Sequence, residues 1–200
     1  MRGKQEGFDM LKELVIKNRS YRGFDENYSF TKEQLESYID LTRYTASSVN
    51  AQPLKYKIVF EKYEVEAVRP LTRWARALPD MVLPHPNMHV TAFIIICQDT
   101  DISPNLARYQ KDIGIVAQTI TLAAVEDGLG GCMIGNFTPD EVKETLNLAE
   151  NLTPMLIIAL GKPAEEIVIK EIENGESTKY YRDENDVHYV PKRKLKDILI

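Results

Sequence analysis

Residues 128–135, GLGGCMIG, and the helical repeat before them decide the fold. Apolar residues recur ahead of the glycines at helical spacing, at Ile113, Val116, Ala117, Ile120 and Ala124. They cover a wide arc, so we expect this helix at the centre of the molecule. A dinucleotide-binding turn has its glycines after a strand and before a helix. Here they follow a helix, which excludes a Rossmann fold and leaves a short apolar strand over 132–134.

On both sides of this stretch, helices and strands alternate. The patterns predict helices over 8–18, 31–42 and 65–78, one that starts at Ser103-Pro104 and runs to Gly128, and one that starts at Thr138. They predict further strands over 55–60, 91–97, 154–160 and 167–172, a turn at 174–175, and a polar, basic tail over 187–200. Thr31 is the expected N-cap of the second helix, with Gln34 closing a capping box. Residues 91–97 are apolar enough for a strand buried on both faces. This order is typical of an α/β or α+β fold with helices packed on a small sheet.

Composition limits the class of protein. The chain has 200 residues, 44% of them hydrophobic and 28% charged, which fits one globular domain over residues 1–200. A net charge of −5 argues against a nucleic-acid partner. Two cysteines do not make a disulfide scaffold, and no apolar run approaches the roughly 20 residues that span a bilayer. The charged first segment lacks a secretory signal, so we expect a reduced, cytoplasmic protein with no membrane partner.

Three segments carry polar groups or glycines that suit a ligand. Residues 18–22, NRSYR, offer guanidinium groups and a hydroxyl, which bind phosphate, although a solvated helix end has the same composition. Residues 46–53, ASSVNAQP, offer hydroxyl and amide groups for the heteroatoms of a planar ring, or form a polar loop. The glycines of 128–135 allow close backbone approach to a ligand, or form a helix C-cap and a tight strand entry.

Together, and in this order, these segments resemble the nitroreductase family of FMN-dependent oxidoreductases. That family shows R-R-S-x-R, P-S-S-x-N-x-Q-P-W, G-L-G-S-C-W-I-G and a strand ending in A-L-G-x-P. This chain has NRSYR at 18–22, ASSVNAQPL at 46–54, GLGGCMIG at 128–135 and LIIALGKP at 156–163. The resemblance extends over roughly residues 10–199.

The resemblance implies a nitroreductase-like α+β fold with a mainly antiparallel central sheet surrounded by helices. It also implies a homodimer with FMN sites at the interface and a C-terminal segment exchanged between subunits. The apolar residues 198–200 suit such an exchange, because an apolar chain end would otherwise fray. The alternative is a tail that folds on its own subunit.

Site residues follow from the same motifs. The resemblance implies that Arg19 and Ser20 hold the phosphate and ribityl chain, with Asn18 in place of the usual first arginine. It puts Arg22 near N1/O2 of the flavin, where a cation stabilises the anionic reduced ring. It puts the backbone of Gly130 and Gly131 at the N5 edge.

Two further groups complete the implied FMN site. Residues of the 46–54 motif reach the flavin from the other subunit: Ser47, Ser48, Asn50 and Gln52. Basic residues of the tail complete the phosphate site in a register that the sequence leaves open: Lys192, Arg193 and Lys194. The implied activity is transfer of hydride from NADH or NADPH through flavin N5 to a small aromatic or quinone-like acceptor, such as a nitroaromatic. No side chain is expected to act as a catalytic acid, base or nucleophile.

Two alternatives keep the same scaffold. One is reductive dehalogenation or flavin fragmentation, for which the discriminating feature is a lid over the flavin, here residues 61–88. The other is a non-catalytic FMN-binding protein, which the departures at Asn18, Ala46 and Gly131 motivate. His85 and His89 are not expected to bind metal, because prolines flank the first of them. His188 is expected in the polar tail without a partner, and Cys97 and Cys132 are expected to be unreactive.

Overall fold

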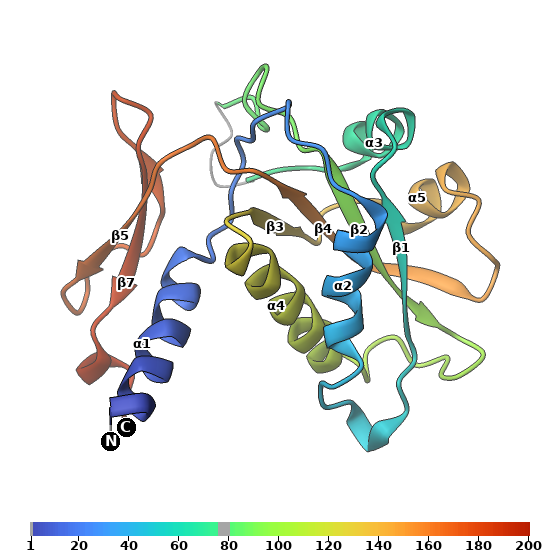
Figure 1. Ribbon diagram of the computed structural model, residues 1–200, viewed down its shortest axis with the longest axis horizontal. Helices are drawn as coiled ribbons and strands as arrows, with labels where there is room; N and C mark the ends of the chain where they lie inside the picture. Colours follow the sequence, from blue (N-terminus) through green and yellow to red (C-terminus); the bar gives the residue numbers. More distant parts are fainter. Residues whose placement is uncertain (1, 76–80) are drawn as a thin grey trace.

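A four-stranded antiparallel sheet forms the centre of the protein, in a computed structural model that describes residues 2–75 and 81–200. Its strand order is β1-β2-β4-β3 (Figure 1). The strands are β1 (Leu54–Val59), β2 (Ala92–Asp99), β3 (Gly130–Ile134) and β4 (Leu152–Gly161). The expected antiparallel core and the expected strands at its centre are therefore confirmed.

Helices cover both faces of this sheet. The helices α2 (Lys32–Thr42) and α4 (Gln110–Glu126) pack on one face, where Ile94 and Ile96 of β2 point toward them. The helices α3 (Lys62–Val68) and α5 (Pro139–Thr145) pack on the other face, with Phe93 and Ile95. Successive side chains of a strand point to opposite faces, so β2 contributes to both cores and its apolar run has no polar alternation.

A second, three-stranded sheet lies at the opposite end of the molecule from α3 and α5 (Figure 1). It has the order β5-β7-β6, with β5 (Ile167–Ile172) parallel to β7 (His188–Arg193) and β6 (Tyr181–Arg182) antiparallel to β7. The segment predicted as a polar, basic tail thus contains a strand, which pairs within its own chain. A 3-10 turn (Leu195–Asp197) and the exposed apolar residues 198–200 follow it.

Four helix predictions need correction. The first helix, α1, spans Arg2–Lys17 rather than 8–18. The helix predicted over 65–78 is α3, followed by a 3-10 turn over Arg69–Leu71; residues 72–75 are not helical, and the rest of that prediction lies outside the described residues. Pro70 lacks the amide N–H that a continuing helix needs. Gln34 donates to Tyr38 Oη at 3.0 Å instead of closing a capping box, although Thr31 caps α2 as expected.

The fourth correction concerns the start of the central helix, which begins at Gln110 and not at Ser103-Pro104. Gln98, fully buried on β2, donates its side-chain amide to the carbonyl oxygens of Ser103 (2.7 Å) and Asn105 (3.2 Å). Asn105 Oδ1 accepts the N–H of Ala107 at 3.1 Å, which forms an Asx turn. These bonds use carbonyls that a helix would need, so the segment stays irregular. No helix among the described residues is long and apolar enough to cross a membrane.

Candidate functional site

The candidate site begins where α1 ends and the chain turns alongside β3. Tyr21 donates its backbone N–H to Gly131 O at 3.1 Å, and Ser20 forms an isolated parallel bridge with Gly131. Asn18 donates its side-chain amide to Thr121 Oγ1 on α4 at 2.9 Å. Two motifs more than a hundred residues apart in the sequence therefore lie against each other.

The glycines of β3 are required by this close approach. A Cβ on Gly131 would lie 2.6 Å from Ala159 O and 2.9 Å from Leu160 Cδ2, on the neighbouring strand. A Cβ on Gly130 would overlap the ring of Tyr21. Both positions therefore need a residue without a side chain for reasons of packing within this chain. Their expected contact with a flavin N5 stays a prediction.

A cavity of about 270 Å³ lies between the segment after α1 and the three-stranded sheet. It brings together three groups of residues: the polar segment Asn18, Arg19, Ser20 and Arg22; the β7 residues His188, Val190 and Lys192; and Ile167 and Tyr180. We call it the phosphate pocket, after the ligand group that its chemistry suits. None of these lining residues is acidic.

Three residues that line the phosphate pocket have a buried nitrogen atom without a hydrogen-bond partner. Arg19 Nε, Arg22 Nε and His188 Nδ1 are buried and have no hydrogen-bond partner. A guanidinium can donate hydrogen bonds but cannot accept them, and a buried donor without an acceptor costs about 1–3 kcal/mol. Burial lowers the pKa of Arg19, with an opposing effect from Tyr21. An anion with several oxygens would supply the missing acceptors.

One Nη atom of each arginine donates to a backbone carbonyl. Arg19 Nη2 donates to Val15 O at 2.9 Å, at the C-terminus of α1. Arg22 Nη1 donates to Ser20 O at 3.1 Å, and its guanidinium lies 5.3 Å from the ring centroid of Tyr180. Arg22 is 8% exposed. These contacts fix the two guanidinium groups in place, and the Nε of each arginine stays free for a ligand.

A buried ion pair lies beside the phosphate pocket and was not found from the sequence. The carboxylate of Glu165, 3% exposed, pairs with the guanidinium of Arg182, 4% exposed. It also accepts the backbone N–H groups of Arg22 and Gly23, the latter at 3.2 Å. The network includes His85, whose Nε2 lies 4.0 Å from Glu165 Oε2. Glu165 thus connects the segment that carries Arg22 to the three-stranded sheet.

His188 lies in the predicted polar tail, but its side chain is buried. It is 2% exposed, and its ring centroid lies 5.3 Å from that of Tyr180. Burial, followed by the charges of Arg182 and Arg22, lowers its pKa to about 4. His188 is therefore neutral at pH 7, although it lines a pocket rich in cations.

The three basic candidates of the tail differ in their surroundings. Lys192 lines the phosphate pocket. Lys194 pairs with Glu173 and lies 4.0 Å from Glu171. Arg193 is exposed and does not line the pocket. The structure therefore brings Lys192, and neither of its two basic neighbours, to Arg19 and Arg22.

The motif at 46–54 lies elsewhere in the chain. Ser47 Oγ donates to Asp112 Oδ2 at 2.6 Å, and Ser48 N donates to the same oxygen at 2.9 Å. Ser47 and Gln52 line a separate hollow of about 220 Å³. Within one chain, this motif does not meet the phosphate pocket.

The tip of that motif holds a strained backbone. Three non-glycine residues of this motif have positive φ values: Val49 (50°), Asn50 (54°) and Gln52 (49°). Positive φ is unfavourable for a β-branched residue such as Val49, and such strain clusters at ligand sites. The Gln52 side chain donates to Asn50 Oδ1 at 3.2 Å, and both residues are exposed. The amide groups expected to bind a ligand are therefore presented outward.

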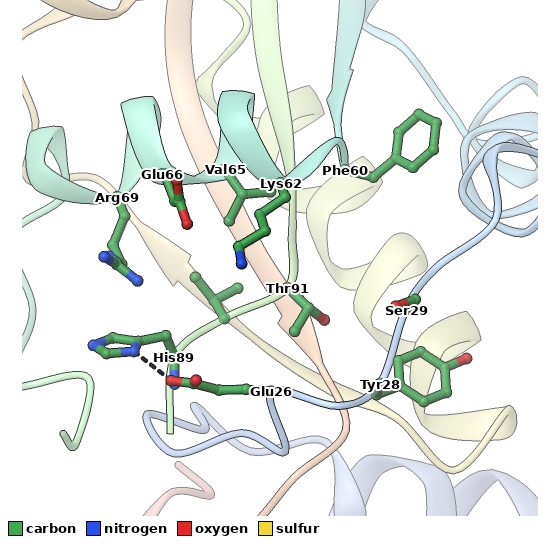
Figure 2. Close-up of a pocket in the computed structure, with 11 residues that line it drawn as sticks. Glu26, Tyr28, Ser29, Phe60, Lys62, Val65, Glu66, Arg69, His89 and Thr91 are labelled. Carbon is green, nitrogen blue, oxygen red and sulfur yellow. Dashed lines mark hydrogen bonds and ion pairs between the residues drawn. The ribbon is translucent and has the colours of Figure 1, made fainter. Parts of the chain in front are cut away.

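A further hollow, of about 240 Å³, lies between α3 and the chain around residues 26–29 (Figure 2). Lys62 and Glu66 of α3 and Arg69 of the 3-10 turn that follows it point toward this hollow (Figure 2). His89, which pairs with Glu26, also points toward it (Figure 2). It contains none of the predicted site residues. The described residues hold no group of three or more His, Cys, Asp or Glu that could bind a metal ion.

Neither cysteine has the properties of a nucleophile. Burial raises the pKa of Cys97 to about 12 and also raises that of Cys132. Both are free thiols and buried. Their placement agrees with the expectation that no thiolate takes part in the chemistry.

The chain is similar in sequence to several known proteins. The profile described as the Nitroreductase family matches residues 15–162. The chain is 26% identical over 185 residues to the oxygen-insensitive NADPH nitroreductase of Helicobacter acinonychis, covering 78% of this chain and 88% of that protein. It is 25% identical over 181 residues to a Cr(VI) reductase of a Pseudomonas species, covering 80% of this chain and 70% of the relative.

Solved structures show the same fold. A nitroreductase family protein from Clostridium difficile is 25% identical, with a TM-score of 0.61, over 76% of this chain and 84% of that one. A protein from Exiguobacterium sibiricum solved in complex with FMN is 18% identical, with a TM-score of 0.64, over 77% and 88% of the two chains.

Proposed function

Because the chain belongs to the nitroreductase family, whose cofactor is FMN, we propose that it is an FMN-dependent oxidoreductase that takes electrons from NADH or NADPH. We propose as its second substrate an electron-poor conjugated acceptor, such as a nitroaromatic or a quinone. The observation that carries the proposal is the set of buried, unpartnered nitrogen atoms on residues that line the phosphate pocket, because the phosphate and the ring system of FMN together supply acceptor atoms for them.

The residues of this chain would bind and orient the cofactor. Arg19, Ser20 and Lys192 would hold the phosphate, while Arg22, clamped by Tyr180, would place a fixed cation toward the ring system. Asn18 would act indirectly, since its side chain is used to bind the segment to α4. The bound flavin supplies the redox chemistry, by accepting a hydride and reducing the acceptor. The protein contributes position, charge and exclusion of water.

The proposal includes a homodimer in which Ser47, Ser48, Asn50 and Gln52 of one subunit reach the flavin held by the other. Apolar side chains without cover support it: on α1, Met10, Leu11, Val15 and Ile16 are 61%, 54%, 45% and 47% exposed, and Ile198–Ile200 are also exposed. Contiguous exposed apolar residues mark interaction surfaces. The proposal takes residues 1–200 as one FMN-binding domain, in a reducing compartment such as the cytoplasm, where free Cys97 and Cys132 persist.

If α1 lies in the dimer interface, negative charges placed on its apolar face should dissociate the dimer. The wild-type chain is expected to sediment at twice 22.9 kDa. Leu11→Glu combined with Val15→Glu should lower that mass to one chain and weaken FMN binding, because two carboxylates would be buried in the interface. Lys17→Glu, also on α1, is the control and should leave the dimer intact. A wild-type protein that sediments as one chain with FMN bound would contradict this part of the proposal.

The test of the activity is anaerobic absorbance spectroscopy of the FMN-reconstituted protein. NADH or NADPH should bleach the flavin band, and a nitroaromatic or a quinone should restore it. A bound flavin that neither nucleotide bleaches would identify a non-catalytic FMN-binding protein and overturn the proposed activity.

A further inference from the structure

His188 is the one lining side chain of the phosphate pocket that sequence reasoning set aside. It lies at the start of β7 and is 2% exposed. Its Nδ1 is buried without a partner, and within residues 2–75 and 81–200 its ring makes no hydrogen bond. A polar ring so thoroughly buried normally has a hydrogen-bond partner. The missing partner therefore points to a group that enters the pocket.

The surroundings of the ring determine what that group can be. Arg22 and Arg182 lie close enough to shift its titration, and Tyr180 packs against its face. Guanidinium groups offer no acceptor, so they cannot satisfy an imidazole N–H. The carboxylates of Glu165 and Asp186 also act on the ring, but more weakly than the two arginines. Glu165 is already used by Arg182 and by two backbone amides.

The backbone that carries the ring is also fixed independently of any ligand, and the ring of Tyr180 packs against the imidazole. The backbone N–H of His188 donates to Glu166 O at 2.9 Å, and Arg182 pairs with His188 in the β6–β7 register. A preorganised donor loses little entropy when it binds. In the tautomer that carries its proton on Nδ1, the neutral ring adds a hydrogen-bond donor to the pocket without adding another buried charge beside Arg19 and Arg22.

We propose that His188 is a neutral hydrogen-bond donor that recognises the phosphate monoester of the cofactor, and so helps the pocket to select FMN over riboflavin. This inference rests on the proposed function, because it takes FMN as the ligand. Hydrogen bonds to charged groups are stronger than those between neutral groups, so the loss of one is expected to weaken binding by about tenfold or more. Riboflavin has no phosphate and would not use this contact.

The experiment compares two flavins and three variants of the full chain, by fluorescence titration at pH 7. His188→Phe keeps a ring against Tyr180 but removes the N–H. It should raise the Kd for FMN about tenfold or more and change the Kd for riboflavin less than twofold. His188→Gln restores a neutral donor and should recover most of the lost FMN affinity. Tyr189→Phe changes the next residue of β7, outside the pocket lining, and should affect neither flavin.

Thermal unfolding with inorganic phosphate alone separates this inference from the proposed function. Phosphate should raise the Tm of the wild-type protein and raise that of His188→Phe less. An equal loss of affinity for both flavins in His188→Phe, or no loss, would overturn the role of His188 while leaving the FMN proposal intact. A wild-type protein that responds to phosphate in this His188-dependent way but binds neither flavin would overturn the proposed function and the selection of FMN, and would leave His188 as a phosphate ligand only.

Discussion

Replacing Glu165 by alanine is expected to lower the free energy of unfolding by about 3–5 kcal/mol. The side chain is 3% exposed, and its loss takes from the guanidinium of Arg182, 4% exposed, its one buried carboxylate partner. The carboxylate of Asp186, 3.2 Å from Arg182 Nη1, remains, but it is 54% exposed and compensates the buried charge less well. It also removes the acceptor of the backbone N–H groups of Arg22 and Gly23. Because the pair lies beside the phosphate pocket, FMN binding should fall together with stability.

The measurement is urea unfolding of the apoprotein, with three comparison variants. Glu150→Ala removes one partner of the pair Lys143–Glu150, at 3.2 Å, in which the carboxylate is fully exposed. Surface pairs contribute about 0–1 kcal/mol, so this change should be small. Glu165→Gln should cost less than Glu165→Ala, because it keeps an acceptor.

The double variant Glu165→Met with Arg182→Met is the most informative of the three. It removes both charges and should be more stable than Glu165→Ala, because no buried guanidinium is left without a buried carboxylate. If Glu165→Ala unfolds like Glu150→Ala, the buried network does not have the structural role assigned to it.

Arg22→Ala is expected to raise the Kd for FMN by about 10–150-fold. This is the change in affinity that corresponds to the loss of one hydrogen bond that involves a charged group. Its Nε is buried without a partner, and its backbone contacts to Glu165 do not depend on its side chain. A cation fixed near the ring favours the anionic reduced flavin, so the reduction potential of the loaded variant should become more negative.

Fluorescence titration gives the affinity, and a spectroscopic redox titration gives the potential. Arg43→Ala is the control: Arg43 is also a cation beside a tyrosine, Tyr44, but it pairs with Asp40 on the exposed end of α2. Arg22→Lys should keep part of the effect on the potential while losing the geometry of the guanidinium. An unchanged potential in flavin-loaded Arg22→Ala would contradict the assignment of Arg22 to the ring.

The parts of the fold that sequence predicted well are those that short-range patterns determine. The unbroken apolar run of 91–97 predicted a strand buried on both faces, and β2 contributes to both cores. The helical repeat before Gly128 predicted the central helix, and its residues Ala117, Ile120 and Ala124 are almost fully buried in α4. In both cases the element is buried on more than one side. It therefore has few polar residues, and this pattern is visible in the sequence.

The parts that sequence missed depend on contacts between distant residues. The start of α4 is delayed because Gln98, on another element, binds carbonyls of the segment before it. The pair of Glu165 with Arg182 has no regular spacing that would indicate contact. His188 was predicted only as part of a polar tail, because its neighbours in the sequence are polar, yet the β5-β7-β6 sheet buries it against Tyr180. The motifs predicted that the polar segment after α1 belongs to the site. Only the structure shows that His188, Tyr180 and other residues of the C-terminal part of the chain line the same pocket.

The most direct test of the central claim is an anaerobic absorbance spectrum of the purified protein after reconstitution with FMN, recorded before and after addition of NADH or NADPH. We expect a protein that retains one FMN per chain and a flavin band that the nucleotide bleaches. A protein that retains no flavin after reconstitution would contradict the assignment of the phosphate pocket to FMN, and with it the proposed oxidoreductase.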